Sequence, residues 1–140
     1  MGNKLNHTQL TDDIFIDQFR NGSLDPALFN HEAHLRLAWL YITTFDLERA
    51  EYEIQKQLQN YVKIVGASDK YHKTLTIVAV RMVNHFIQKS KSTNFGNFIR
   101  EFPQMNKEFK QLINTHYSFN IFTSEKARQE FLEPDLLPLV

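Results

Sequence analysis

The chain has 140 residues, which is the length of one domain and enough to bury a hydrophobic core without stabilising cross-links. It is 42% hydrophobic and 13% aromatic, with twelve Phe, a composition typical of globular rather than disordered proteins. Sixteen basic residues balance sixteen acidic ones, which argues against nucleic-acid binding, and the lack of Cys excludes disulfides, thiolate metal sites and a cysteine nucleophile.

The first half of the chain predicts three helices. A short helix is expected over 14–20, stopped by Asn21-Gly22, and a longer one over 30–44 with Asn30 as its N-cap. The longer helix is apolar on most sides, so we expect it at the centre of the fold. A third helix, from Asp46 to about Gly66, repeats apolar residues at steps of three and four, the pattern of an amphipathic helix.

The second half predicts one long helix followed by shorter ones. The long helix begins at Ser68 or Asp69 and runs to about Lys89, with a buried apolar stripe. Shorter helices are expected over 95–102, 105–113 and 124–132.

These elements predict an all-α, single-domain helical bundle over 1–140, with a four-helix core and shorter C-terminal helices around it. We expect residues 1–12 to be flexible. Residues 133–140, which contain Pro134 and Pro138, should form an extended tail.

Several common functions are excluded or disfavoured by missing motifs. No Gly-x-Gly occurs, which excludes dinucleotide and phosphate loops. His31-Glu32-Ala33-His34 is not a zinc-protease motif, because the second His would have to stand where Leu35 is. The longest apolar run, residues 37–42, is too short to span a membrane, and the polar start lacks a signal-peptide pattern, so we expect a cytoplasmic protein without membrane partners.

A set of histidines carries the functional prediction. His31 and His34, three residues apart at the start of the second helix, share a face that continues to Tyr41. His72 starts the fourth helix, with Thr76 one turn later on the same face. Because the second and fourth helices of an up-down bundle run parallel, these N-terminal ends should meet in one pocket.

The pocket has alternative chemistries. A helix N-terminus disfavours imidazolium, and neutral His is the form that binds metal or acts as a base. His31, His34 and His72 with one water would form an open zinc site, and iron, nickel or copper would accept the same ligands. The alternatives are a metal-free polar pocket that binds a small molecule or performs acid–base chemistry, and purely structural histidines. We expect His7, His85 and His116 at the surface or in lone hydrogen bonds.

Three segments resemble a family of small, all-helical bacterial proteins of unknown function. Residues 29–39 are similar to its F-x-H-x-x-H-x-x-x-A signature, residues 70–76 to its YH-x-T-x-T segment, and residues 124–139 to its C-terminal segment. The resemblance implies no activity, but it marks the same histidine-bearing segments.

Together these features favour a small-molecule-binding bundle with a polar, histidine-lined pocket, and they leave open whether the protein is an enzyme or a homo-oligomer. The alternative function is a non-catalytic protein-interaction module with structural histidines, in which the aromatic C-terminal half or the Leu-rich tail offers the apolar surface.

Overall fold

The computed structural model describes residues 6–139, and all regular secondary structure in that range is helical, which confirms the predicted all-α helical bundle. The α-helices are α1 (Asp12–Asn21), α2 (His31–Thr44), α3 (Leu47–Ile64), α4 (Lys73–Ile87), α5 (Phe95–Glu101), α6 (Gln104–Lys107), α7 (Phe109–Asn114) and α8 (Glu125–Gln129). Three single-turn 3-10 helices are η1 (His7–Gln9), η2 (Pro26–Leu28) and η3 (Ser68–Lys70).

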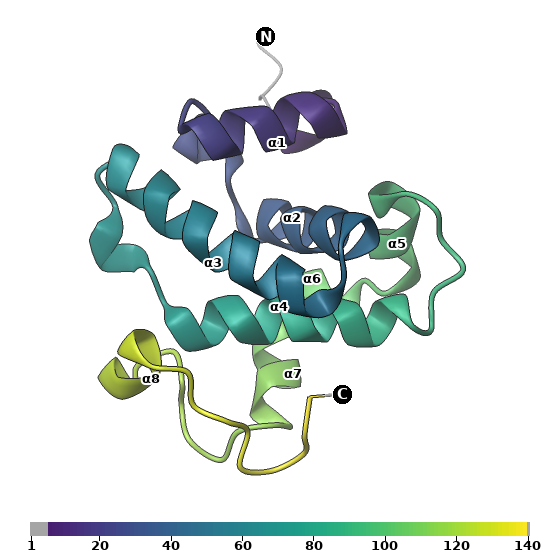
Figure 1. Ribbon diagram of the computed structural model, residues 1–140. Helices are drawn as coiled ribbons and strands as arrows, with labels where there is room; N and C mark the ends of the chain where they lie inside the picture. Colours follow the sequence, from purple (N-terminus) through teal and green to yellow (C-terminus); the bar gives the residue numbers. More distant parts are fainter. Residues whose placement is uncertain (1–5, 140) are drawn as a thin grey trace, which may run out of the picture.

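Helix α2 lies at the centre of the fold, as its apolar sequence predicts. Eight of its fourteen residues are buried, and it packs against both α3 and α4. Helix α1 packs on α3, and α8 packs on α4. Figure 1 shows α1 at one end of the molecule and the C-terminal α7 and α8 at the other, with α2, α3 and α4 between them. None of the helices described here is long and apolar enough to cross a membrane.

Side-chain caps fix where the first three α-helices begin. Thr11, Asn30 and Asp46 each accept a hydrogen bond from the backbone N–H three residues later. These bonds satisfy donors that have no partner inside the helix, so the chain turns helical at these points. Gly22 ends α1 with φ 82°, a left-handed conformation that glycine adopts without steric cost.

The fourth helix begins later than predicted. Residues 68–70 form η3, and α4 starts at Lys73 with His72 as its N-cap. The His72 Nδ1 accepts a hydrogen bond from the Leu75 backbone N–H at 3.0 Å. The expectation that Ser68 or Asp69 caps this helix was wrong, because an imidazole nitrogen of His72 performs the capping, three or four residues downstream.

The start of the chain is folded where flexibility was expected. Residues 1–5 lie outside the described residues, but 6–12 form η1 and the beginning of α1. His7 is completely buried, with 0% of its surface exposed, and contacts both Arg36 and Glu32, which corrects the expectation of a surface histidine or a lone hydrogen bond. It lies over α2, where its ring neighbours Phe15 and Phe95.

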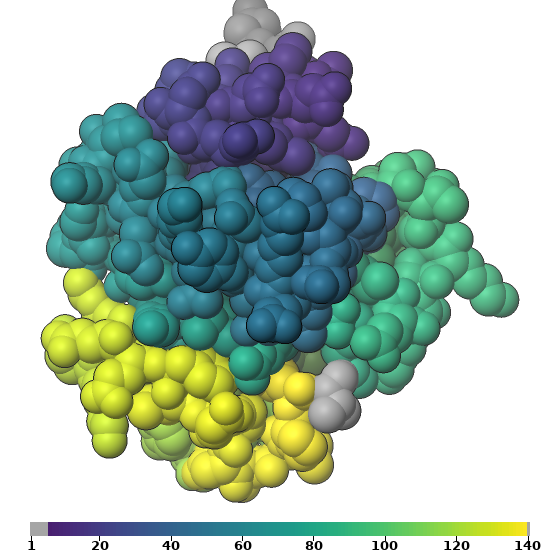
Figure 2. Space-filling view, in the orientation of Figure 1, coloured from purple at the N-terminus to yellow at the C-terminus, as the bar shows by residue number. Residues whose placement is uncertain are grey.

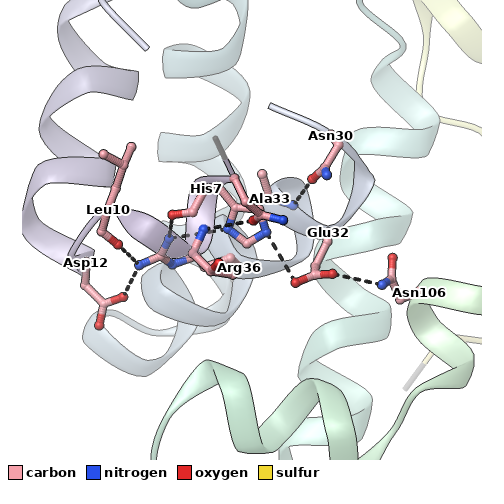
Figure 3. Close-up of polar contacts among 10 residues, drawn as sticks. His7, Leu10, Asp12, Asn30, Glu32, Ala33, Arg36 and Asn106 are labelled. Atoms are coloured by element: carbon pink, nitrogen blue, oxygen red, sulfur yellow. Dashed lines mark hydrogen bonds and ion pairs between the residues drawn. The ribbon is translucent and has the colours of Figure 1, made fainter. Parts of the chain in front are cut away.

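Arg36 holds this N-terminal segment on α2 (Figure 3). Its guanidinium is buried and donates to the backbone carbonyls of His7 at 2.6 Å and Leu10 at 2.8 Å. It also pairs with Asp12 at 2.8 Å and lies 4.6 Å from the centre of the Phe15 ring. The guanidinium gives the Leu10 carbonyl its donor and adds a second donor to the His7 carbonyl, which also accepts from the Leu10 backbone N–H at 3.1 Å.

The neighbouring Glu32 continues the same network. His7 Nδ1 lies 3.3 Å from Arg36 Nη1 and its Nε2 lies 3.3 Å from the Glu32 carboxylate, whose other oxygen accepts from Asn106 of α6 at 3.1 Å. Burial lowers the pKa of His7, and Arg36 lowers it further, while Glu32 acts in the opposite direction. Residues of the N-terminus, α2 and α6 are therefore joined by one chain of polar contacts.

The C-terminal tail packs on the body, against the turn after α7, and residues 130–139 form no helix. The Leu136 backbone N–H donates to the His116 carbonyl at 2.9 Å, and Asp135 accepts from the Ser118 backbone N–H at 2.9 Å. His116 in turn makes one side-chain hydrogen bond, to the Leu137 carbonyl at 2.9 Å. Figure 2 shows this C-terminal part covering the end of the molecule opposite α1.

The Arg36 network yields a stability prediction. Replacing Arg36 with Met should lower the free energy of unfolding by about 3 kcal/mol, because the Leu10 carbonyl loses its donor and the His7 carbonyl loses one of its two donors. Asp12→Asn is the matched control and should cost less than about 1 kcal/mol, since that side chain is 57% exposed. Urea denaturation measures both, and equal effects of the two variants would contradict this assignment.

Candidate functional site

A pocket with a volume of about 490 Å³ opens where the N-terminal turns of α2 and α4 meet the C-terminal end of α3. Its remaining walls come from the loop before α2, from the start of α7 and from the loop before α8. The lining residues are Pro26, Phe29, Asn30, His31, His34, Leu58, Tyr61, Val62, Val65, Ala67, Lys70, Tyr71, His72, Leu75, Thr76, Ala79, Phe109 and Phe122.

Four of the five predicted pocket residues line this cavity, namely His31, His34, His72 and Thr76. Tyr41 does not. It lies two turns beyond His34, about 10 Å along the axis of α2, where its hydroxyl donates to Gln57 of α3. Burial raises the pKa of Tyr41 to about 12, so it is a neutral phenol in the core. Tyr41 is buried, as expected for a residue on the same helical face as His34, but it lies too far along α2 to line the pocket.

Two of the three histidines are committed to backbone carbonyls. His31 Nε2 donates to the Met105 carbonyl at 3.0 Å, and the His31 ring lies 4.5 Å from that of Phe109. His72 uses both nitrogens, because Nδ1 caps α4 and Nε2 donates to the Ile121 carbonyl at 2.8 Å. This pattern fixes His72 as the neutral Nε2–H tautomer. Both rings thus connect the bundle to the C-terminal half of the chain.

His34 is the uncommitted histidine. Its ring stacks on Phe29 with the ring centres 4.0 Å apart, and its nitrogens have no hydrogen-bond partner in the part of the chain that the structure describes. Burial lowers its pKa to about 4, with a smaller contribution from His31. The sequence predicted a neutral His from the helix N-terminus, whereas the main cause here is the loss of hydration.

The three imidazoles share the pocket, but they do not present three free nitrogens to one point. Across residues 6–139, no group of three or more His, Cys, Asp or Glu side chains is arranged to hold a metal ion. His72 has no lone pair left for a metal, and His31 has only Nδ1. The zinc, iron, nickel or copper site with His31, His34 and His72 stays a prediction, and the hydrogen bonds do not favour it.

Sequence reasoning missed the aromatic walls. Phe29 immediately precedes the Asn30 cap, a position from which an apolar side chain commonly packs back onto its helix, so its role had a local signal. Phe109 and Phe122 come from the C-terminal half, where periodicity is weak, and only tertiary structure brings them to the pocket. Lys70 at the rim belongs to η3, which was expected to be part of the fourth helix.

Comparison of the chain with family models, with curated proteins and with solved structures finds no match. The site is therefore interpreted from its own geometry, and the resemblance of residues 29–39, 70–76 and 124–139 to a family of small bacterial proteins stays a prediction.

The depressed pKa of His34 predicts an acid-sensitive fold. The unfolded pKa is near 6.5 and the folded pKa about 4, so the unfolded state takes up the proton first as the pH falls. The contribution of His34 to the free energy of unfolding is fully present above pH 6.5 and should decline between pH 6.5 and pH 4, by up to about 3 kcal/mol. Urea titrations of wild type and His34→Gln across this range measure the effect, because only the wild type carries this titration. Parallel pH profiles would contradict it.

The two roles of His72 can be separated by substitution. His72→Asn keeps a capping side chain for α4 but loses the bond to the Ile121 carbonyl, and should cost about 1 kcal/mol. His72→Ala loses both interactions and should cost about 2 kcal/mol. Thermal unfolding monitored by circular dichroism compares them, and an Asn variant as unstable as the Ala variant would exclude the capping role.

Proposed function

We propose that this protein binds a small organic molecule in the pocket between α2, α3 and α4. The observation that carries the proposal is the His34 imidazole, which lines a cavity of about 490 Å³ without a hydrogen-bond partner among the described residues. A cavity of this size, mainly apolar and with few polar groups, has the properties of a small-molecule site.

Binding is favoured over catalysis by the chemistry of His34. A general base works best when its pKa is near the working pH, whereas the pKa of His34 is about 4. At pH 7 the ring is neutral, but it is a weak base that captures a proton about a thousandfold less readily than a histidine titrating at 7. Its suitable role is to donate or accept a hydrogen bond, which orients a bound molecule without reacting with it.

His31 and His72 support the site without contacting a ligand through Nε2. Their hydrogen bonds to the Met105 and Ile121 carbonyls hold α6 and the loop before α8 beside α2 and α4. These two segments adjoin Phe109 and Phe122, the aromatic residues of the far wall. The roles of the histidines are thus divided, with His31 and His72 shaping the pocket and His34 left for the ligand.

The second candidate is the interaction module predicted from the aromatic C-terminal half and the tail. It is favoured by Phe119, Leu136 and Leu137, whose exposed fractions are 38%, 53% and 60%. Apolar side chains of this size exposed on one part of a chain are typical of protein contacts. A cytoplasmic location and a homo-oligomer are compatible with both functions and stay predictions.

Ligand binding can be tested with neutral aromatic probes. Indole and naphthamide, titrated into the protein and followed by amide NMR, should shift resonances of the first turns of α2 and α4. Ala79→Phe places a large ring in the pocket and should abolish these shifts, whereas Tyr52→Ala, on the exposed face of α3, should leave them unchanged.

Two results would contradict the proposal. Shifts confined to residues around Phe119, Leu136 and Leu137 would favour the interaction module. Pocket shifts that persist in a folded Ala79→Phe variant would show that the probes bind elsewhere.

A further inference from the structure

The electrostatics of the pocket restrict the ligand further. Of the residues that line it, Lys70 alone carries a side chain with a fixed charge at neutral pH, and no lining residue is Asp or Glu. His72 is neutral because its Nδ1 accepts a hydrogen bond, and burial keeps His34 unprotonated at pH 7. The pKa of Tyr71 is raised by burial, so its hydroxyl carries no charge. The one fixed charge in the lining is therefore the exposed ammonium of Lys70 at the rim.

The shape of the lining also carries information. Aromatic rings reach the pocket from five separate segments, through Phe29, Tyr61, Tyr71, Phe109 and Phe122. The two histidines of α2 already pair with two of them, His34 with Phe29 in a stacked arrangement and His31 with Phe109 in a tilted one. Rings held in this way offer faces and edges on which another flat ring packs favourably.

From these two observations we infer that the ligand is a planar aromatic molecule with one negative charge, such as an aromatic carboxylate. The inference rests on the proposed function, since it assigns a ligand class to the same pocket. The ring lies among the aromatic side chains, and the anionic group faces the Lys70 ammonium at the rim. His34 supplies a hydrogen bond to the ligand inside the pocket.

The alternatives are less compatible with the lining. A cationic ligand would meet Lys70 and would find no carboxylate among the pocket residues. A dianion or a phosphate would leave a charge without a partner, since one ammonium is present and dense anion sites use several donors. A saturated acyl chain would fill the space but would gain nothing from the stacked rings beyond burial.

Four probes test the inference by calorimetric titration at low salt. Naphthoate should bind about twofold to fivefold more tightly than naphthamide, the gain expected for an exposed ion pair. Naphthylmethylammonium should bind more weakly than naphthamide, and octanoate more weakly than naphthoate. Added salt should remove the advantage of naphthoate over naphthamide, because the pair is at the surface.

A matched pair of variants assigns the charge. Lys70→Gln should equalise the affinities of naphthoate and naphthamide without lowering the affinity for naphthamide. Lys73→Gln removes the same charge three residues along the chain, outside the pocket lining, and should leave the preference intact. An unchanged preference in Lys70→Gln would overturn the role of Lys70.

The outcomes separate this inference from the proposed function. Equal affinities of wild type for naphthoate and naphthamide, both abolished by Ala79→Phe, would overturn the anionic ligand and leave small-molecule binding intact. Octanoate binding as tightly as naphthoate would overturn the aromatic preference alone. If no probe binds in the pocket at millimolar concentration, the proposed function fails as well.

Discussion

Two hydrogen bonds from imidazoles to backbone carbonyls hold the C-terminal half of this chain against its helical core, and the pocket depends on them. His31 reaches Met105, and His72 reaches Ile121, across 74 and 49 residues of sequence. One bond satisfies a carbonyl of the single-turn helix α6, and the other a carbonyl in the irregular segment before α8. Together with the bonds from Asn106 to Glu32 and from Thr74 to the Glu130 carbonyl, they position the segments that carry Phe109 and Phe122 on α2 and α4.

The different roles of the histidines follow from the backbone hydrogen-bonding groups that lie beside each of them. His72 starts a helix, so one nitrogen is taken by a backbone N–H and the other by a carbonyl. His34 lies one turn inside α2, where the backbone donors are already engaged, and its ring stacks on Phe29 instead. A ring in that position has free nitrogens and little hydration, which gives it both its low pKa and its suitability for holding a ligand.

The features that could be predicted from the sequence are those that depend on residues close together in the chain. The caps Thr11, Asn30 and Asp46 and the amphipathic rhythm of α3 are signals within a few residues, so the main helices could be located from them. The burial of His7 could not, because it depends on Arg36, 29 residues away, reaching its carbonyl. The late start of α4 and the position of Tyr41 were missed for a related reason. A histidine cap is uncommon, and depth along a helix depends on which neighbours close the cavity.

The contacts of α2 and α6 have a mechanical consequence. Adjacent residues of α2, His31 and Glu32, hold adjacent residues of the other segment, Met105 and Asn106, and Glu32 also contacts His7. The amino-terminal segment is thus connected to the pocket through the hydrogen bonds of His31 and Glu32. A change that loosens residues 6–12 would be transmitted through these contacts to the wall of the cavity. This segment therefore influences how firmly the cavity keeps its shape, although it does not line the pocket.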